Sequence, residues 1–138
     1  MFKRIMPLVV LSLVFAVACT ASGKYGDIKA LHSETISAMN DYSSKIESAK
    51  TGKEVADAMT SFSVKINKIM IKGKTLEKKY PELAKKEDIP ELKESEAKME
   101  KAQQRMTKAM SMAVPKFMGD KNFMKAMQEM SKNGMGMK

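Results

Sequence analysis

Methionine is the chemically capable residue whose number and placement stand out in this chain. The sequence has 138 residues and 15 methionines, but only one cysteine and one histidine. Ten of the methionines lie between residues 99 and 137. Thioether sulfur is a soft ligand that selects Cu(I) over harder cations. A soft-metal site for Cu(I) or Ag(I) is therefore one predicted function, and its candidate ligands are Met124, Met127, Met130, Met135 and Met137.

Helical geometry favours a structural role for the same methionines. Met124, Met127 and Met130 are three residues apart, and each such step turns a helix by about 300°, so the three side chains spread over about 120° of its surface. Methionine at helical spacing commonly fills gaps in a hydrophobic core. No second histidine is present to complete a copper site. Packing is the leading interpretation, metal binding is the alternative, and sacrificial oxidation of exposed methionines is a third.

The residues needed for catalysis are sparse. His32 is the one side chain whose ordinary pKa suits a general base near neutral pH, and Cys19 is the one thiol. Carboxylates fall among lysines at helical spacing, as Glu94 and Lys98 do, which is typical of a solvated helix face. The sequence contains no glycine-rich phosphate loop. We therefore predict a protein that is not an enzyme and has no cofactor.

The first nineteen residues have the pattern of an export signal. Lys3 and Arg4 give a positive start, residues 5–18 form an uncharged apolar run, and Cys19 follows directly. A helix that spans a bilayer needs about 20 apolar residues, so this run is too short. A positive start, a short apolar stretch and small residues before a cleavage site are typical of a secretory signal. Residues 1–18 are therefore predicted to be removed as a signal peptide.

The end of this segment, Ala16-Val17-Ala18-Cys19, resembles the lipobox of bacterial lipoproteins. The resemblance implies that Cys19 is lipidated on sulfur and becomes the new N-terminus, anchoring the chain in a membrane. Ala16 stands where that family usually has leucine, and ordinary signal peptidase, cutting at the same bond, would leave Cys19 free. Thr20 is not the aspartate that can retain such lipoproteins in the inner membrane, so the resemblance favours the periplasmic side of the outer membrane. Residues 19–26 are then the lipidated cysteine and a flexible tether.

The chain beyond the tether has the periodicity of helices. Apolar residues recur every three to four positions in three segments, and no segment alternates with the two-residue period of a strand. The recurring positions are Ile28, Leu31, Ile36, Met39, Tyr42, Ile46 and Ala49; then Val55, Met59, Phe62, Ile66, Ile69, Gly73, Leu76 and Tyr80; then Leu92, Met99, Ala102, Met106, Ala109, Met110 and Ala113.

Polar residues predict where three of the helices begin. Asp27 is expected to cap the first helix. Thr51 and Glu54 are expected to form a capping box at the start of the second, and Asp88 with Glu91 a similar box at the start of the third.

Proline and glycine predict the ends. Pro81 is expected to stop the second helix, and Pro115 to kink or end the third. Gly119 followed by Asp120 indicates a stop and a new N-cap, opening a fourth helix that runs to about Lys132.

These elements predict an all-α fold: an antiparallel helical bundle of three long helices and one short C-terminal helix, with the second helix as its spine. The bundle is expected to span residues 27–133, and residues 134–138 to form a frayed tail. The scaffold weakly resembles the haem-b four-helix cytochromes, which bind haem between a methionine in the first helix and a histidine in the last. Met39 matches the methionine, but no histidine follows residue 32, so the resemblance implies the scaffold without haem.

Positive charge is concentrated near the C-terminus. The chain carries a formal net charge of +9, and residues 101–138 hold eight basic residues against two acidic ones. Nearly all are lysines rather than the arginines favoured in nucleic-acid recognition, so no nucleic-acid partner is predicted. Such charge either solvates a helix face or attracts anionic lipid, surface polysaccharide or an acidic envelope protein. The leading prediction is a membrane-anchored lipoprotein of the bacterial cell envelope with a non-enzymatic binding or structural role, its C-terminal helices forming the contact surface.

Overall fold

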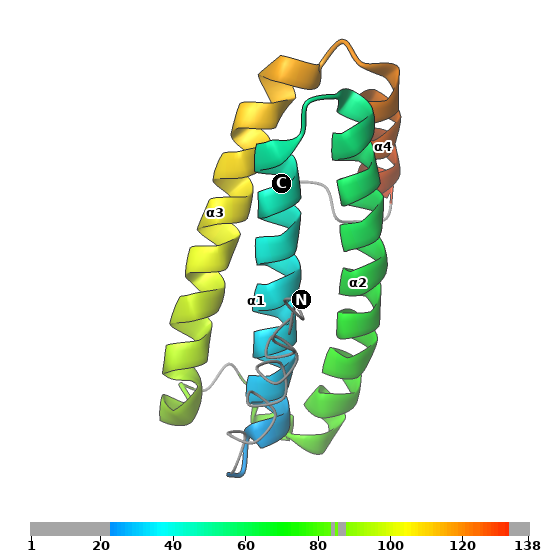
Figure 1. Ribbon diagram of the computed structural model, residues 1–138. Coiled ribbons are helices and arrows are strands. Elements are labelled where there is room, and N and C mark those ends of the chain that lie inside the picture. The colour runs from blue at the N-terminus through cyan, green and yellow to red at the C-terminus, as the bar shows by residue number, and fades with distance from the viewer. Residues whose placement is uncertain (1–22, 84, 86–87, 133–138) are drawn as a thin grey trace, which may run out of the picture.

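The computed structural model describes residues 23–83, 85 and 88–132, and within them the chain is helical with no strand. The predicted all-α class is therefore confirmed. Three helices are long and the fourth is short (Figure 1). The elements are α1 (Gly26–Ser48), α2 (Gly52–Lys79), the single 3-10 turns η1 (Pro81–Leu83) and η2 (Pro90–Leu92), α3 (Lys93–Phe117) and α4 (Lys121–Lys132). Cys19, Met135, Met137, the signal peptide and the tail lie outside the described residues.

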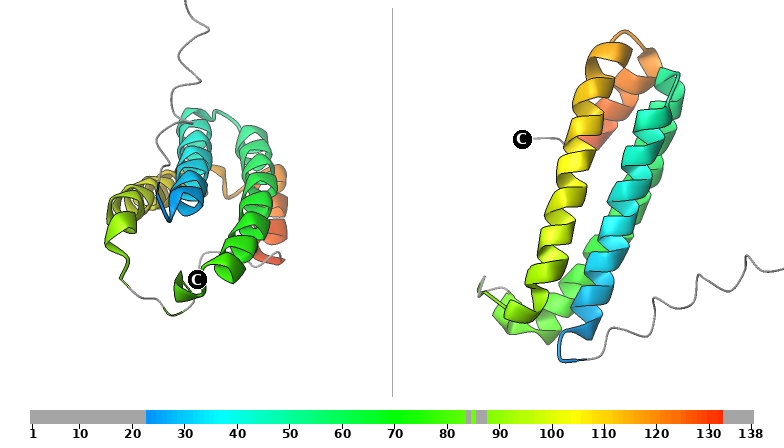
Figure 2. Two further views of the ribbon diagram at one scale, coloured as in Figure 1. Left: turned by 90° about the horizontal axis from the view of Figure 1, so that it is seen from below. Right: turned by 60° about the vertical axis from the view of Figure 1, so that its left-hand side comes forward.

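The central long helix is α1, not α2 as the sequence suggested. α1 packs against both α3 and α2, whereas α4 packs against the upper part of α2 (Figures 1 and 2). Helices that follow one another in the chain are antiparallel. α1 and α3, however, lie side by side and run in the same direction, because the chain crosses the lower end of the bundle between α2 and α3. That crossing segment, residues 80–92, is long enough to place α3 beside α1 instead of beside α2.

A ladder of ion pairs sets the register of α1 against α2. Its members are seven residues apart on each helix, which is two helical turns and keeps them on one edge of the pair. The pairs are Lys65–Asp41 and Lys72–Glu34, each with a nitrogen–oxygen distance of 2.7 Å, and Lys79–Asp27. Behind the ladder, Tyr42 stacks on Phe62 with ring centroids 4.6 Å apart.

Acid is expected to weaken this helix pair. Lys79 holds the pKa of Asp27 below its ordinary value, and Lys65 together with Lys45 does the same for Asp41. A carboxylate with a lowered folded pKa stabilises the fold above its unfolded pKa of about 3.9, and that contribution is lost as pH falls through the folded value. The contribution of these two carboxylates to the urea midpoint should therefore stay constant from pH 7 to pH 5. Below pH 4 it should be lost, and the midpoint should fall. In the variant Asp27→Asn/Asp41→Asn the midpoint should start slightly lower and fall less, so an equal fall in both proteins would contradict the assignment.

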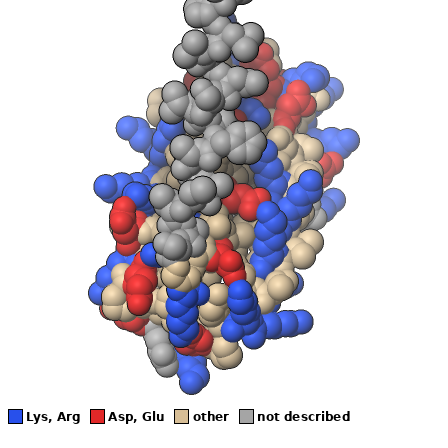
Figure 3. Space-filling view, turned by 60° about the horizontal axis from the view of Figure 1, so that its bottom comes forward, with Lys and Arg blue, Asp and Glu red and all other residues tan. Residues whose placement is uncertain are grey.

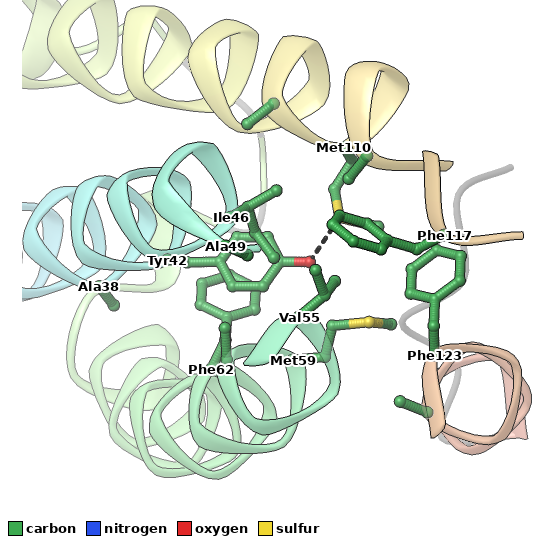
Figure 4. Packing of buried hydrophobic residues seen from close by; sticks show 14 of the residues in the cluster. Ala38, Tyr42, Ile46, Ala49, Val55, Met59, Phe62, Met110, Phe117 and Phe123 are labelled. Carbon is green, nitrogen blue, oxygen red and sulfur yellow. Dashed lines mark hydrogen bonds between the residues drawn. The ribbon is translucent and has the colours of Figure 1, made fainter. Parts of the chain in front are cut away.

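The main core joins all four helices at the upper end (Figure 4). Val55 and Met59 of α2 and Phe123 of α4 are almost fully buried in it. The Tyr42 hydroxyl donates a hydrogen bond to Met110 Sδ at 2.8 Å, so this buried polar group has a partner. A second, smaller core at the lower end packs the start of α1 against the segment that follows α2; its buried members are Tyr25, Ile28, Tyr80, Ile89 and Leu92.

Two of the predicted helix starts form, the capping box of α2 and the Asp120 N-cap of α4. The Thr51 hydroxyl accepts from the Glu54 N–H, and the Glu54 carboxylate accepts from the Thr51 N–H. The prediction for Asp27 is wrong: α1 begins one residue earlier, at Gly26, and Asp27 pairs with Lys79. The second predicted box is also wrong, because Asp88 pairs with Lys93 and η2 begins without a side-chain cap.

Pro81 marks the end of α2, whereas Pro115 does not end α3. α2 stops at Lys79, two residues before Pro81. Pro115 lies inside α3, which continues to Phe117. A proline so near the C-terminal end removes one backbone hydrogen bond in the last turn, so the helix can accommodate it.

Candidate functional site

The C-terminal region of the bundle, α4 with the last turns of α3, was the predicted contact surface. Asp120 caps α4: its Oδ1 accepts from the backbone N–H groups of Asn122 and Phe123 at 2.8 and 3.2 Å. Phe123 packs against Phe117 and is 1% exposed. Gly52, at the start of α2, lies directly under Asp120. The two turns at the upper end of the bundle are therefore packed together, and α4 packs on the main core through buried Phe123 and Ala126.

The methionines of α4 do not share one open face. Met127 and Met130 are half-buried and pack against the main core, whereas Met124 is 41% exposed. This division follows from the wide angular spread of residues three apart on a helix. Met135 and Met137 lie outside the described residues. Within the part of the chain that the structure describes, no three His, Cys, Asp or Glu side chains come together as metal ligands.

Unpaired positive charge and exposed thioethers occur together in the C-terminal region. Met112 and Met118 are exposed, as Met124 is. No lysine between residues 108 and 132 forms an ion pair within the described residues, in contrast to the laddered lysines of α2. Lys116 is used internally, because its Nζ donates to the carbonyl of Ala49 at the end of α1. The rest of the region presents soft apolar groups among solvated ammonium groups.

One side-chain pair with the elements of a catalytic dyad was missed from the sequence. His32 Nδ1 lies 2.7 Å from Ser95 Oγ, joining α1 to the start of α3. The Ser95 hydroxyl donates to the carbonyl of Leu92 at 2.8 Å, so the imidazole is the donor in the pair and does not activate the hydroxyl. Burial lowers the pKa of His32, which favours the neutral ring. The hydrogen bond therefore links α1 to α3. Its two residues are 63 positions apart, so no local sequence pattern predicts it.

Residues 24 and 25, which precede α1, are held against the lower end of the bundle by side-chain contacts. Tyr25, assigned to the tether from the sequence, is buried, and its hydroxyl donates to Glu82 at 2.9 Å. Lys24 lies 2.8 Å from Glu82 and lowers the pKa of that carboxyl to about 2. An open pocket of about 450 Å³ lies beside these contacts, lined by Lys24, Tyr25, Glu82, Asp88, Ile89, Pro90 and Glu91. Residues 24 and 25 are thus tied to the segment that links α2 to α3.

Neither protein families, nor curated protein sequences, nor solved structures gave a match to this chain. Among the helices formed by the described residues, none combines the length and apolar character needed to cross a bilayer.

Proposed function

We propose that this chain is a lipid-anchored protein of the bacterial cell envelope that acts by non-enzymatic contact. The observation that carries the proposal is the sequence of residues 1–19, an export signal that closes on a lipobox-like Cys19. Two acyl chains hold a protein in a bilayer far more firmly than one, because each buried methylene contributes about 0.8 kcal/mol. The lipid would be the attachment, and the helical bundle the part that meets a partner.

The geometry of the bundle supports a division of roles between its two ends. Tyr25 is fixed at the lower end, so an anchor at Cys19, six residues earlier in the sequence, would attach near that end. α1 rises 23 residues, or about 35 Å, to the upper end, where α3 meets α4. The C-terminal region therefore lies at the end of the bundle opposite the one at which an anchor through Cys19 would attach.

The chemistry of the C-terminal region supports an anionic partner. Its lysines have no ion partners within the described residues, and its exposed methionines adapt to irregular apolar surfaces. Anionic lipid, surface polysaccharide and an acidic envelope protein all have the required charge. We favour the envelope protein, because exposed thioethers add an apolar component that a polysaccharide does not use.

Soft-metal binding remains the alternative function. Since Met127 and Met130 pack against the core, the ligands left for Cu(I) are Met124, Met135 and Met137. Titration of residues 20–138 with Cu(I) against a competing chelator tests this directly. Submicromolar affinity that is lost in Met124→Leu/Met135→Leu/Met137→Leu supports it, and absence of measurable binding removes it.

Replacing the anchoring cysteine is expected to release the protein. With the full chain expressed in a bacterium that has two membranes, the wild type should sediment with membranes, and its mature N-terminal peptide should carry the mass of a lipidated cysteine. Cys19→Ala should lose the added mass and leave most of the protein in the soluble or unprocessed fraction. Ser22→Ala, three residues away, should behave as the wild type. An unlipidated wild-type chain that retains Met1 in the cytoplasm would overturn the proposal.

A further inference from the structure

The lower half of α2 exposes apolar residues where solvent should favour polar ones. Val64 is 52% exposed and Ile71 is 68% exposed. They are seven residues apart, so they lie on one line along the helix. Lys68, Lys74 and Lys78 lie on the same side at nearby helical angles. We call these five residues the α2 outer face.

The same half-helix carries a strong excess of positive charge. Residues 64–79 contain six lysines and one acidic residue. Three of the lysines form the ladder with α1 and are neutralised there. The other three are those of the α2 outer face, and none forms an ion pair within the described residues. In Figure 3, basic side chains and uncharged ones lie side by side on the right-hand side, where α2 lies, and further charged side chains of both signs cover the rest of this view.

The lower end of the α2 outer face also lies near Tyr25, the residue that precedes α1. Tyr80 follows α2 directly, and its ring lies 5.5 Å from that of Tyr25. Tyr25 therefore lies at the lower end of this half-helix. An anchor attached through a short tether would keep the outer face near the membrane surface.

We infer that the α2 outer face binds the surface of an anionic bilayer and lays the lower half of the bundle along it. Lysines flanking a line of aliphatic residues suit this role, because the ammonium groups reach the headgroups while the aliphatic groups sink below them. A second copy of the chain is a poorer occupant, since symmetric pairing of two such faces would bring six unneutralised lysines together. α3 lies on the other side of α1 from α2, so it stays available to a partner (Figure 1). The orientation rests on the proposed lipid anchor, but binding by this face does not require the lipid.

Vesicle binding by residues 20–138 tests the face separately from the anchor. This segment contains every contact described above, and its folding is to be checked by circular dichroism before vesicles are added. The probe is sedimentation with vesicles of phosphatidylcholine and phosphatidylglycerol at a 7:3 ratio, compared with pure phosphatidylcholine. Each lysine near an anionic surface contributes about fivefold to partitioning, so Lys68→Gln/Lys74→Gln/Lys78→Gln should weaken binding by about a hundredfold. Ile71→Ser, which leaves the charge unchanged, should weaken it by several-fold.

A matched variant removes the same charge elsewhere. Lys101→Gln/Lys108→Gln/Lys121→Gln alters exposed lysines of α3 and α4 and should weaken binding by less than about fivefold. Equal weakening by both triple variants, equal binding to uncharged vesicles, or no binding by the wild type would overturn the inference. So would a wild-type dimer that Ile71→Ser converts to a monomer. Failure of lipidation at Cys19 would instead overturn the proposed function and leave the vesicle result intact.

Discussion

Phe123→Ala is expected to lower the free energy of unfolding by about 3–5 kcal/mol, the usual cost of deleting a fully buried aromatic side chain. Phe123 is 1% exposed, and its ring packs on Phe117 of α3. α4 has only 12 residues and two buried ones, Phe123 and Ala126. An isolated helix of this length is marginal in water, so its docking must come from packing. Loss of the ring should therefore free α4 from α2 as well as destabilise the main core.

The neighbouring residue provides the control. Met124 is on the same short helix but 41% exposed, so Met124→Ala should change stability by less than about 0.5 kcal/mol. Urea unfolding of residues 20–138 followed by circular dichroism measures both variants. Similar losses in the two would show that α4 is held by helix propensity or diffuse contacts instead of its buried ring.

Local patterns in the sequence predicted the elements well because they act over three to four residues. The 3.6-residue apolar repeat indicated the helices, and all seven positions predicted for the third segment are buried or half-buried. The Thr51–Glu54 box formed because both of its hydrogen bonds are made within one turn. Asp88 had the same spacing to Glu91 but a competing partner in Lys93, and Pro90 begins a 3-10 turn there.

The packing partners of the helices depend on residues far apart in the chain, so no local pattern predicts them. The hydrogen bonds that join α1 to α3, such as His32–Ser95 and Tyr42–Met110, connect residues more than 60 positions apart. A connection of thirteen residues between α2 and α3 permits α3 to lie beside either preceding helix. The packing of side chains in the two cores together determines that α3 lies beside α1.

Two features of the surface did leave a signal in the sequence. Three acids of α1 and three lysines of α2 recur at spacings of seven, and that shared period matches the observed ladder. Val64 and Ile71 fall outside the apolar seam of α2, and this position on the helix agrees with their observed exposure. The proposed lipid anchor at Cys19 is a different case. It is predicted from a local sequence motif alone, and no contact among the described residues bears on it.

Two glycines of α2 are expected to respond to alanine with opposite signs. A Cβ on Gly52 would lie 2.2 Å from Asp120 Cγ and 2.5 Å from Asp120 Cβ, atoms too close to the backbone to move aside. Gly52→Ala should therefore cost about 1–3 kcal/mol, as overpacking does, and should displace the cap of α4. A Cβ on Gly73 would meet only Leu31 Cδ2 at 3.7 Å, an ordinary contact. Gly73→Ala should gain about 0.5–1 kcal/mol, because glycine weakens a helix interior.

The sign difference tests how the upper end is built, since both changes add one methyl group to the same helix. Urea midpoints of the two variants measure the stabilities, and amide hydrogen exchange at Phe123 reports the state of α4. In Gly52→Ala that amide should exchange faster, because it donates to the displaced Asp120 carboxylate. In Gly73→Ala it should exchange no faster than in the wild type. If Gly52→Ala were stabilising, the α1–α2 turn and the α3–α4 turn could not be in contact, and α4 would have to dock on α2 in another position.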